Sequence, residues 1–235
     1  MALETFAEQL AHLRARIARA AEQSGRPASA VRLVGASKTV PAERLIQAIA
    51  LGLREFGENR VQEAETKIPA VHLVQSAQGA PPRWHLIGHL QSNKARRAAA
   101  LFDVVQSVDS VKLAQALDRH AADLGRRLEV LVEVNTSGEA QKSGVAPADA
   151  LALVAEARKL PRLDVRGLMT VGPLVERPDD ARPAYQALAR LLAQAREKWP
   201  ELTELSMGMS GDYDVAIAEG ATLVRIGSAL FGARQ

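Results

Sequence analysis

The sequence predicts a single (β/α)₈ TIM barrel of the α/β class, with one extra helix before the first strand. Short apolar runs alternate with longer amphipathic runs from residue 31 to the end of the chain, giving eight strands, each separated from the next by a helix. Continuous alternation favours a parallel sheet, and eight units are what a closed barrel needs. No Pro-, Gly- or Ser-rich linker interrupts the pattern, so we expect one domain over residues 1–235.

The composition agrees with this fold class. Of the 235 residues, 47% are hydrophobic but only 3% are aromatic, so Leu, Val, Ile and Ala must fill the core, as in helices packed on strands. Cysteine is absent, which excludes disulfides and thiolate metal sites. The first 25 residues lack the apolar centre of a signal peptide, and no apolar run approaches a membrane span, so we expect a soluble, cytoplasmic protein.

The charge pattern argues against a nucleic-acid partner. The net charge is only +3, and the densest basic cluster is Lys94, Arg96 and Arg97. Nucleic-acid binding normally needs a longer basic face with stacking aromatic side chains, whereas Trp84 and Phe102 fall on segments expected to be buried. A solvated helix face is the better interpretation of the cluster.

The expected elements follow one another in a regular order. A first helix at 2–24 has an apolar stripe that includes Leu10 and Ile17, ends at Gly-Arg-Pro, and should cover part of the barrel. Strands are expected at 31–38, 53–58, 84–88, 104–108, 128–135, 165–171, 202–208 and 223–227. Helices are expected at 41–52, from about 60, and at 92–102, 110–125, 147–160, 179–199 and 214–220. Pro41 and Pro147 mark helix starts, and Ser110 suits an N-cap.

The run at 128–135 shows clean strand alternation. One set of side chains should face the helices (Val130, Val132 and Val134) and the other should face the opposite way (Glu129, Leu131, Glu133 and Asn135). A doubly wound open sheet is the main rival fold. It would usually show a Gly-rich dinucleotide-binding turn after its first strand, where this chain has GASKTVP with a lysine.

Lys38 ends the first predicted strand, VRLVGASK, and shares a face with Val34 and Ala36. In a barrel this places the amine inward at the C-terminal rim, where such folds carry their chemistry. A partly desolvated amine can attack an aldehyde and form a Schiff base, and we expect that aldehyde to be pyridoxal phosphate. A lysine after a strand is more often a solvated charge, so the other rim segments must decide.

Two later segments end at the same rim and suit a phosphate. They are SMGMSGD at 206–212 and RIGS at 225–228, after the seventh and eighth strands. Glycines that permit close backbone approach combine there with hydroxyl donors and a helix start near Asp212: Gly208, Gly211, Gly227, Ser210 and Ser228. Simple helix capping explains either segment alone, but two in consecutive units favour an anion site.

Arg225 lies between Val224 and Ile226, which alternation sends outward, so its guanidinium should face the barrel interior. A buried guanidinium stays protonated and needs a partner. That partner is either an acid such as Glu133 or the pyridine nitrogen of the cofactor. With arginine there the ring would stay unprotonated, which limits carbanion chemistry.

The histidines indicate no metal site. His85 and His89 flank Gly88 on a predicted strand, so their spacing is not the helical metal-ligand pattern, and no third ligand stands at a convincing separation. His12, His72 and His120 fall in helical sequence. The sequence contains no GxSxG nucleophile motif.

Several motifs resemble a known family. They are ASKTVP, GENRVQE, WHLIGHLQSNK, VNTSGEAQKSGV, RGLMT, LSMGMS and VRIGSALFG, and they span nearly the whole chain in order. Together they resemble the pyridoxal phosphate homeostasis proteins, single-domain relatives of the alanine racemase barrel.

The resemblance implies roles for individual residues. Lys38 would carry the Schiff base, and Arg225 would meet the pyridine nitrogen. The phosphate would be surrounded by Ser210, Gly211, Gly227 and Ser228, and the ring would lie beside Asn59 and Met207. The loop after LSMGMS departs from the expected pattern, because GDYD has no acid directly after the serine, which puts Gly211 in doubt.

The resemblance also implies a protein of vitamin B6 and amino-acid homeostasis that carries or buffers pyridoxal phosphate without established turnover. Racemisation needs a second acid-base group opposite the lysine, and no second domain is left to supply it. Tyr185 lies in a long predicted helix, and Tyr213 follows the phosphate loop. A weak racemase-like enzyme and a Schiff-base aldolase that uses Lys38 remain alternatives.

The partners follow from this interpretation. Apo-enzymes that depend on pyridoxal phosphate would receive the cofactor, and the missing second domain permits a monomer. Lys142, in the polar loop SGEAQKSG, could accept the cofactor transiently during transfer, although a solvated loop lysine is the simpler interpretation.

Overall fold

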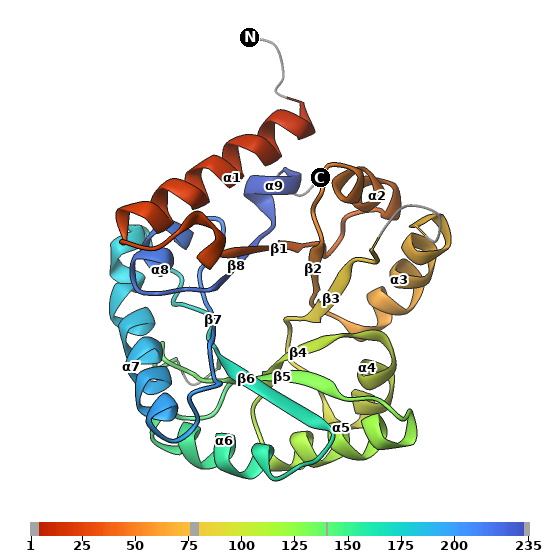
Figure 1. Ribbon diagram of the computed structural model, residues 1–235, viewed down its shortest axis with the longest axis vertical. Helices are drawn as coiled ribbons and strands as arrows, with labels where there is room; N and C mark the ends of the chain where they lie inside the picture. The colour runs from red at the N-terminus through yellow and green to blue at the C-terminus, as the bar shows by residue number, and fades with distance from the viewer. Residues whose placement is uncertain (1–4, 76–79, 140, 233–235) are drawn as a thin grey trace.

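The strands close into a ring in chain order (Figure 1). The computed structural model describes residues 5–75, 80–139 and 141–232, and within these ranges eight parallel strands form the barrel. They are β1 (Arg32–Ala36), β2 (Glu55–Glu58), β3 (Arg83–Leu86), β4 (Val104–Val108), β5 (Leu128–Glu133), β6 (Leu163–Met169), β7 (Glu204–Ser206) and β8 (Leu223–Ile226). Because β8 pairs with β1, the sheet has no free edge. The predicted fold class is confirmed.

The helices surround this ring. They are α1 (Phe6–Gln23), α2 (Ala42–Ala50), α3 (Val61–Gln75), α4 (Ala95–Leu101), α5 (Val111–Asp123), α6 (Ala150–Arg158), α7 (Arg182–Lys198), α8 (Tyr213–Ala218) and α9 (Ser228–Phe231). Short 3₁₀ turns lie at Ala28–Ala30, Ser92–Lys94, Pro147–Asp149 and Pro178–Ala181, and the last three stand where helices were expected to begin. Among the described residues, no helix is both long and apolar enough to cross a bilayer.

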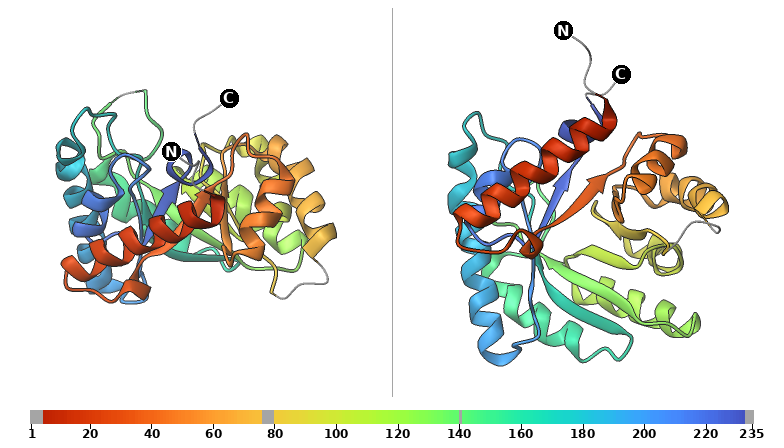
Figure 2. Two further views of the ribbon diagram at one scale, coloured as in Figure 1. Left: turned by 90° about the horizontal axis from the view of Figure 1, so that it is seen from above. Right: turned by 45° about the horizontal axis from the view of Figure 1, so that its top comes forward.

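The extra N-terminal helix runs along the outside of the barrel (Figure 2). Its start is fixed by a capping box, in which the Thr5 hydroxyl accepts from the Glu8 N–H at 3.3 Å and the Glu8 carboxylate accepts from the Thr5 N–H at 2.7 Å. Its apolar stripe packs against α8 and α9, and Phe6 stacks on Phe231 with 5.8 Å between ring centroids. The helix therefore covers part of the barrel, as expected, and it does so where the last strand meets the first.

The apolar core lies mainly between the strands and the helices. Outward-facing residues of β5, Val130 and Val132, belong to this large cluster, as the alternation predicted. A second, small cluster fills part of the barrel interior with Val34, Leu131, Met169 and Leu223. Much of the remaining interior is polar or charged, which matters for the site.

The backbone of β6 passes unusually close to β7 at Gly167. The register between β5 and β6 shifts just before this residue, and Gly167 pairs with Glu204 of β7. A β-carbon at Gly167 would lie 1.9 Å from the carbonyl oxygen of Glu204. Only glycine permits this approach, which brings the beginning of β7 against β6.

Replacement of Gly167 by alanine should therefore open the β6–β7 pairing. We expect Gly167→Ala to lower the free energy of unfolding by more than about 3 kcal/mol, measured by urea denaturation. Gly211→Ala is the matched control, because a β-carbon there meets nothing within 4 Å. Equal stability of the two variants would contradict this close packing.

Candidate functional site

The rim at the C-terminal ends of the strands brings the predicted site segments together. Lys38 lies two residues beyond the end of β1 and is half-buried. The register pairs Val34 of β1 with Arg225 of β8, so the turns after these two strands are neighbours. A β-carbon on Gly227 would lie 3.4 Å from the carbonyl oxygen of Ala36. The Lys38 loop and the turn after β8 therefore share one side of the rim.

Asn59 follows β2 at the same rim. Its side-chain oxygen is buried and has no hydrogen-bond partner among the described residues. The turn after β3 presses against it, since a β-carbon on Gly88 would lie 2.3 Å from the Asn59 carbonyl oxygen. An acceptor buried without a donor is costly, so this oxygen suits a polar group of a bound molecule.

The turns after β7 and β8 meet at Ser210. The Ser210 hydroxyl oxygen accepts from the backbone N–H groups of Gly227 and Ala229, each at 3.3 Å. Gly211 and Ser228 are exposed beside this contact, and a β-carbon on Gly211 would meet nothing within 4 Å. The two segments predicted to bind phosphate thus form one cradle with open space in front of it.

Asp212 holds the turn after β7 in place, a function that the sequence did not reveal. One carboxylate oxygen accepts from the Met209 N–H at 2.6 Å, and the other accepts from the Tyr185 hydroxyl at 2.7 Å. Burial and the charge of Asp212 raise the pKa of Tyr185, so its phenol stays protonated. The acid expected directly after Ser210 thus has a structural counterpart two residues along.

Met207 follows β7 but lies in the apolar core. Its side chain is fully buried in the large cluster between the strands and the helices, whereas the neighbouring Ser206 makes hydrogen bonds inside the barrel. Its place beside the ring of a cofactor stays a prediction.

Arg225 lies inside the barrel, as its alternation with Val224 and Ile226 predicted. One guanidinium nitrogen donates to the Ser206 hydroxyl at 2.6 Å and another donates to the Thr170 carbonyl oxygen at 2.7 Å. These acceptors are neutral groups on β7 and just beyond β6, and Glu133, the acid expected as a partner, interacts with Arg225 through its charge. Burial lowers the pKa of Arg225, which nearby negative groups partly offset.

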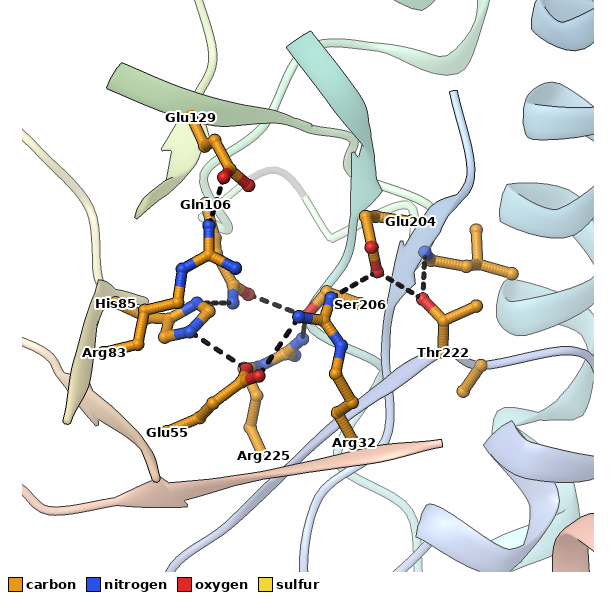
Figure 3. A network of polar contacts seen from close by, with 12 residues as sticks. Arg32, Glu55, Arg83, His85, Gln106, Glu129, Glu204, Ser206, Thr222 and Arg225 are labelled. Carbon is orange, nitrogen blue, oxygen red and sulfur yellow. Dashed lines mark hydrogen bonds and ion pairs between the residues drawn. The ribbon is translucent and has the colours of Figure 1, made fainter. Parts of the chain in front are cut away.

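The hydrogen bonds continue from Ser206 across the barrel (Figure 3). The Ser206 hydroxyl donates to the Gln106 side-chain oxygen at 2.6 Å, and the Gln106 nitrogen lies 2.9 Å from Nδ1 of His85. Since the Gln106 oxygen already accepts, its nitrogen must donate to Nδ1, which leaves the ring hydrogen on Nε2. That nitrogen lies 3.1 Å from a carboxylate oxygen of Glu55. These contacts form a continuous chain from the Arg225 cation to the Glu55 anion, which we call the polar ladder: Arg225, Ser206, Gln106, His85 and Glu55.

Charged pairs extend this ladder toward the N-terminal ends of the strands (Figure 3). Arg32 lies 3.1 Å from Glu55 and 2.8 Å from Glu204, and Arg83 pairs with Glu129. Burial alone would raise the pKa of Glu55, but the contact with His85 and the charges of Arg32 and Arg83 outweigh it and lower this pKa. Glu55 is therefore the ionised end of the ladder.

The comparisons with known proteins agree with this geometry. The family model "Alanine racemase, N-terminal domain" matches residues 9–235. The "Pyridoxal phosphate homeostasis protein" of Pseudomonas aeruginosa is 46% identical over 236 residues, covering 99% of this chain and 97% of the relative. The protein of the same name from Vibrio cholerae is 42% identical over 235 residues, covering 99% and 98%. The chain belongs to the pyridoxal phosphate homeostasis family. The resemblance drawn from the sequence motifs is confirmed.

Solved structures support the family assignment. PipY of Synechococcus elongatus, solved with PLP bound, is 38% identical and has a TM-score of 0.82, covering 97% of this chain and 100% of its own. A protein of Bifidobacterium adolescentis described as unknown is 37% identical with a TM-score of 0.91, covering 96% and 94%. This chain therefore shares its fold with these two proteins over at least 94% of their length.

Lys142 in this member of the family is tied to the rim. Its amine donates to the Gly172 carbonyl oxygen at 2.8 Å and lies 2.6 Å from a carboxylate oxygen of Glu139. These contacts join the loops that follow β5 and β6. Transient acceptance of a cofactor by Lys142 would require both contacts to break, and it stays a prediction.

Glu133, at the end of β5, is a second acid inside the rim. Its side chain is buried, and Oε2 has no hydrogen-bond partner among the residues described. Burial and repulsion by Asp109 raise the pKa of Glu133 to about 7, although the charge of Arg225 acts in the opposite direction. The carboxyl is therefore about half protonated near neutral pH.

This raised pKa makes the fold depend on pH. In the unfolded chain Glu133 titrates near 4.5, so its protonated form stabilises the fold fully below pH 4.5 and this contribution is lost as the pH rises through about 7. Relative to Glu133→Gln, the parent should lose about 3 kcal/mol of unfolding free energy across this range. Urea denaturation of both proteins at a series of pH values measures the difference. A difference that stays constant with pH would contradict the burial of this acid.

The polar ladder predicts that removal of the Ser206 hydroxyl alone lowers the free energy of unfolding. Ser206→Ala removes an acceptor from buried Arg225 and a donor from Gln106, so it should cost about 2 kcal/mol of unfolding free energy. Ser107→Ala is the matched control, because the buried Ser107 hydroxyl has no hydrogen-bond partner among the described residues. Urea denaturation should show a clear loss for the first variant and none for the control. Equal losses would show that Ser206 stabilises only by packing.

Proposed function

We propose that this protein binds pyridoxal 5′-phosphate at the rim, with Lys38 holding the cofactor as a Schiff base. The observation that carries the proposal is the pairing of β1 with β8, which gathers the Lys38 loop, Arg225 and the Gly227 turn on one side of the barrel. The cofactor has an aldehyde, a pyridine nitrogen and a phosphate, and an amine, a guanidinium and a backbone cradle are their natural partners. The name of the relatives and the PLP bound to PipY support the same conclusion.

The residues at the rim fit pyridoxal 5′-phosphate. The N–H groups of Gly227 and Ala229 are shared by one hydroxyl oxygen at 3.3 Å, so stronger phosphate acceptors can replace it. The buried oxygen of Asn59 needs a donor that the described part of the chain does not supply. Gly211 and Ser228 would complete the phosphate site, and Met207, whose side chain lies in the outer core, would lie beside the ring through its backbone.

Arg225 would orient the ring and limit its chemistry. A guanidinium has donors and no acceptor, so it pairs with the lone pair of an unprotonated pyridine nitrogen. Pyridoxal phosphate supplies an electron sink that is strong only when this nitrogen carries a proton. Since the polar ladder holds Arg225 in place, the site would favour holding the cofactor over carbanion chemistry.

The tyrosines of the chain support a function without turnover. The Tyr185 phenol donates to Asp212 and stays protonated, and the Tyr213 ring packs in the core between the strands and the helices, with the Arg16 guanidinium of α1 5.2 Å from its centroid. Neither is free to act as a second acid-base group. The protein would thus carry or buffer the cofactor in vitamin B6 and amino-acid homeostasis, passing it to apo-enzymes. Residues 1–235 would act as one unit, monomeric and cytoplasmic.

Glu133 favours a weak enzyme as the second candidate. Its pKa of about 7 suits proton transfer near neutral pH, and it faces Arg225 inside the rim. A weak racemase-like or aldolase activity would then disappear in Glu133→Gln and in Lys38→Ala alike. Turnover assays with amino acids and with phosphorylated aldehydes measure it, with Lys38→Ala as the blank.

Borohydride trapping tests the proposed function directly. The parent, mixed with pyridoxal phosphate, should show a visible absorption band, and reduction should fix the cofactor on the peptide that contains Lys38. Lys38→Ala should lose both signals, whereas Lys142→Ala, the control, should keep them because Lys142 is held by Glu139 and Gly172. An adduct on any other lysine of the parent would contradict the proposal. Equal transfer rates to an apo-enzyme for Lys142→Ala and the parent would exclude Lys142 from transfer.

A further inference from the structure

A second lysine is buried directly behind the Lys38 loop. Lys67, on α3, has a side chain that is only 8% exposed. Its amine donates to the Ser37 carbonyl oxygen at 2.7 Å and to carboxylate oxygens of Glu58 and Glu63, each at 2.8 Å. An ammonium group carries three hydrogens, so every donor of Lys67 is used.

The same cluster holds both peptide groups that flank Lys38. The Ser37 carbonyl belongs to the peptide group before Lys38 and accepts from Lys67. The Thr39 N–H belongs to the peptide group after Lys38 and donates to Glu63 at 2.6 Å. The Ser37 hydroxyl also donates to Glu58 at 2.6 Å. The Val40 N–H also donates to the Ser37 carbonyl oxygen at 3.0 Å and closes a turn around Lys38 and Thr39. Groups on β2 and α3 therefore hold this turn from both sides of Lys38.

Thr39 shows that this part of the loop is strained. Its φ is +63°, in the left-handed region that β-branched residues avoid. Such a conformation persists only where the surroundings hold it. Within the loop, the Thr39 hydroxyl donates to the Lys38 carbonyl oxygen at 2.6 Å and the Val40 N–H donates to the Ser37 carbonyl oxygen. The hydrogen bond from the Thr39 N–H to Glu63 is the contact that holds this turn from α3.

The attachment of α3 to the barrel does not need these charges. Val61, Ala64, Ile68 and Val71 already bury the apolar face of α3 in the core. The Glu58 carboxylate is fully buried, and its second oxygen has no hydrogen-bond partner among the residues described. Burial raises the pKa of Glu58, and Lys67 and Ser37 offset part of this effect. Buried charges add little stability, so their placement around one loop indicates a positioning function.

We propose that Lys67 and Glu63 are positioning residues for Lys38. They fix the peptide groups on either side of its Cα and so direct its side chain, an inference that rests on the proposed attachment of pyridoxal phosphate to Lys38. A side chain ordered before binding loses less entropy when it bonds to the cofactor. The cluster would act through Lys38 and would not itself contact the cofactor.

The first experiment uses the protein without cofactor and measures amide hydrogen exchange at Thr39. In the parent this N–H is hydrogen-bonded to Glu63 and should exchange slowly. Glu63→Ala should speed its exchange by at least about tenfold, and Glu63→Gln, which keeps an acceptor oxygen, should restore much of the protection. Unchanged exchange in Glu63→Ala would overturn the inference. Glu63 is chosen because loss of Lys67 would leave Glu58 buried without its cation.

The second experiment measures the affinity for pyridoxal phosphate by visible absorption. Glu63→Ala should bind roughly tenfold more weakly than the parent, about 1.4 kcal/mol, and Glu63→Gln should recover part of the loss. Adding Thr39→Gly to Glu63→Ala should also recover part of it, because glycine adopts a positive φ without strain.

Arg26→Met controls for general destabilisation. Arg26 donates to the carbonyl oxygens of Ile217, Gly220 and Ala221, away from the Lys38 loop, so its loss should lower the melting temperature and leave the affinity unchanged. If the parent and Glu63→Ala hold the cofactor equally well, the inference fails and the proposed function stands. A parent that holds no cofactor on Lys38 overturns both.

Discussion

The burial of one guanidinium inside a closed ring of strands is the constraint on which the rest of the structure depends. Arg225 is enclosed on all sides, so its hydrogens need acceptors from neighbouring strands. The Ser206 hydroxyl oxygen supplies one of these acceptors, and its own hydrogen is donated to Gln106. Gln106 in turn donates to His85, whose other ring nitrogen lies beside the Glu55 carboxylate. The interior of the barrel is therefore a polar ladder with a small apolar cluster beside it, and the ladder holds Arg225 in one orientation.

Two separate networks would then set the two ends of a bound cofactor. The ladder inside the barrel holds Arg225, which would meet the ring nitrogen. The cluster of Lys67, Glu58 and Glu63 lies between β2 and α3 and holds the loop of Lys38, which would meet the aldehyde. Both networks use β2, through Glu55 and Glu58, but they share no residue, so substitutions in one should leave the other intact. This separation lets the orientation of the ring and the attachment of the cofactor be studied independently.

Alternation along single strands was sufficient to predict the barrel and the inward direction of Arg225, because each property depends on a local period of two residues. The ladder could not be predicted in the same way. His85 and Gln106 lie on different strands, and only the closure of the sheet brings their side chains within 2.9 Å. Lys67 has the spacing of an ordinary surface ion pair with Glu63, so its burial depends on how α3 packs. The positive φ of Thr39 lies in a turn that the Val40 N–H closes on the Ser37 carbonyl oxygen, and a β-branched threonine is not a residue type that predicts it.

A crystal structure of the protein soaked with pyridoxal phosphate tests the central claim most directly. The account predicts continuous electron density from the Lys38 amine to the cofactor, with the pyridine nitrogen at hydrogen-bond distance from Arg225 and the phosphate between Ser210 and Gly227. Density that joins the cofactor to another lysine, or a ring nitrogen that faces away from Arg225, would contradict it.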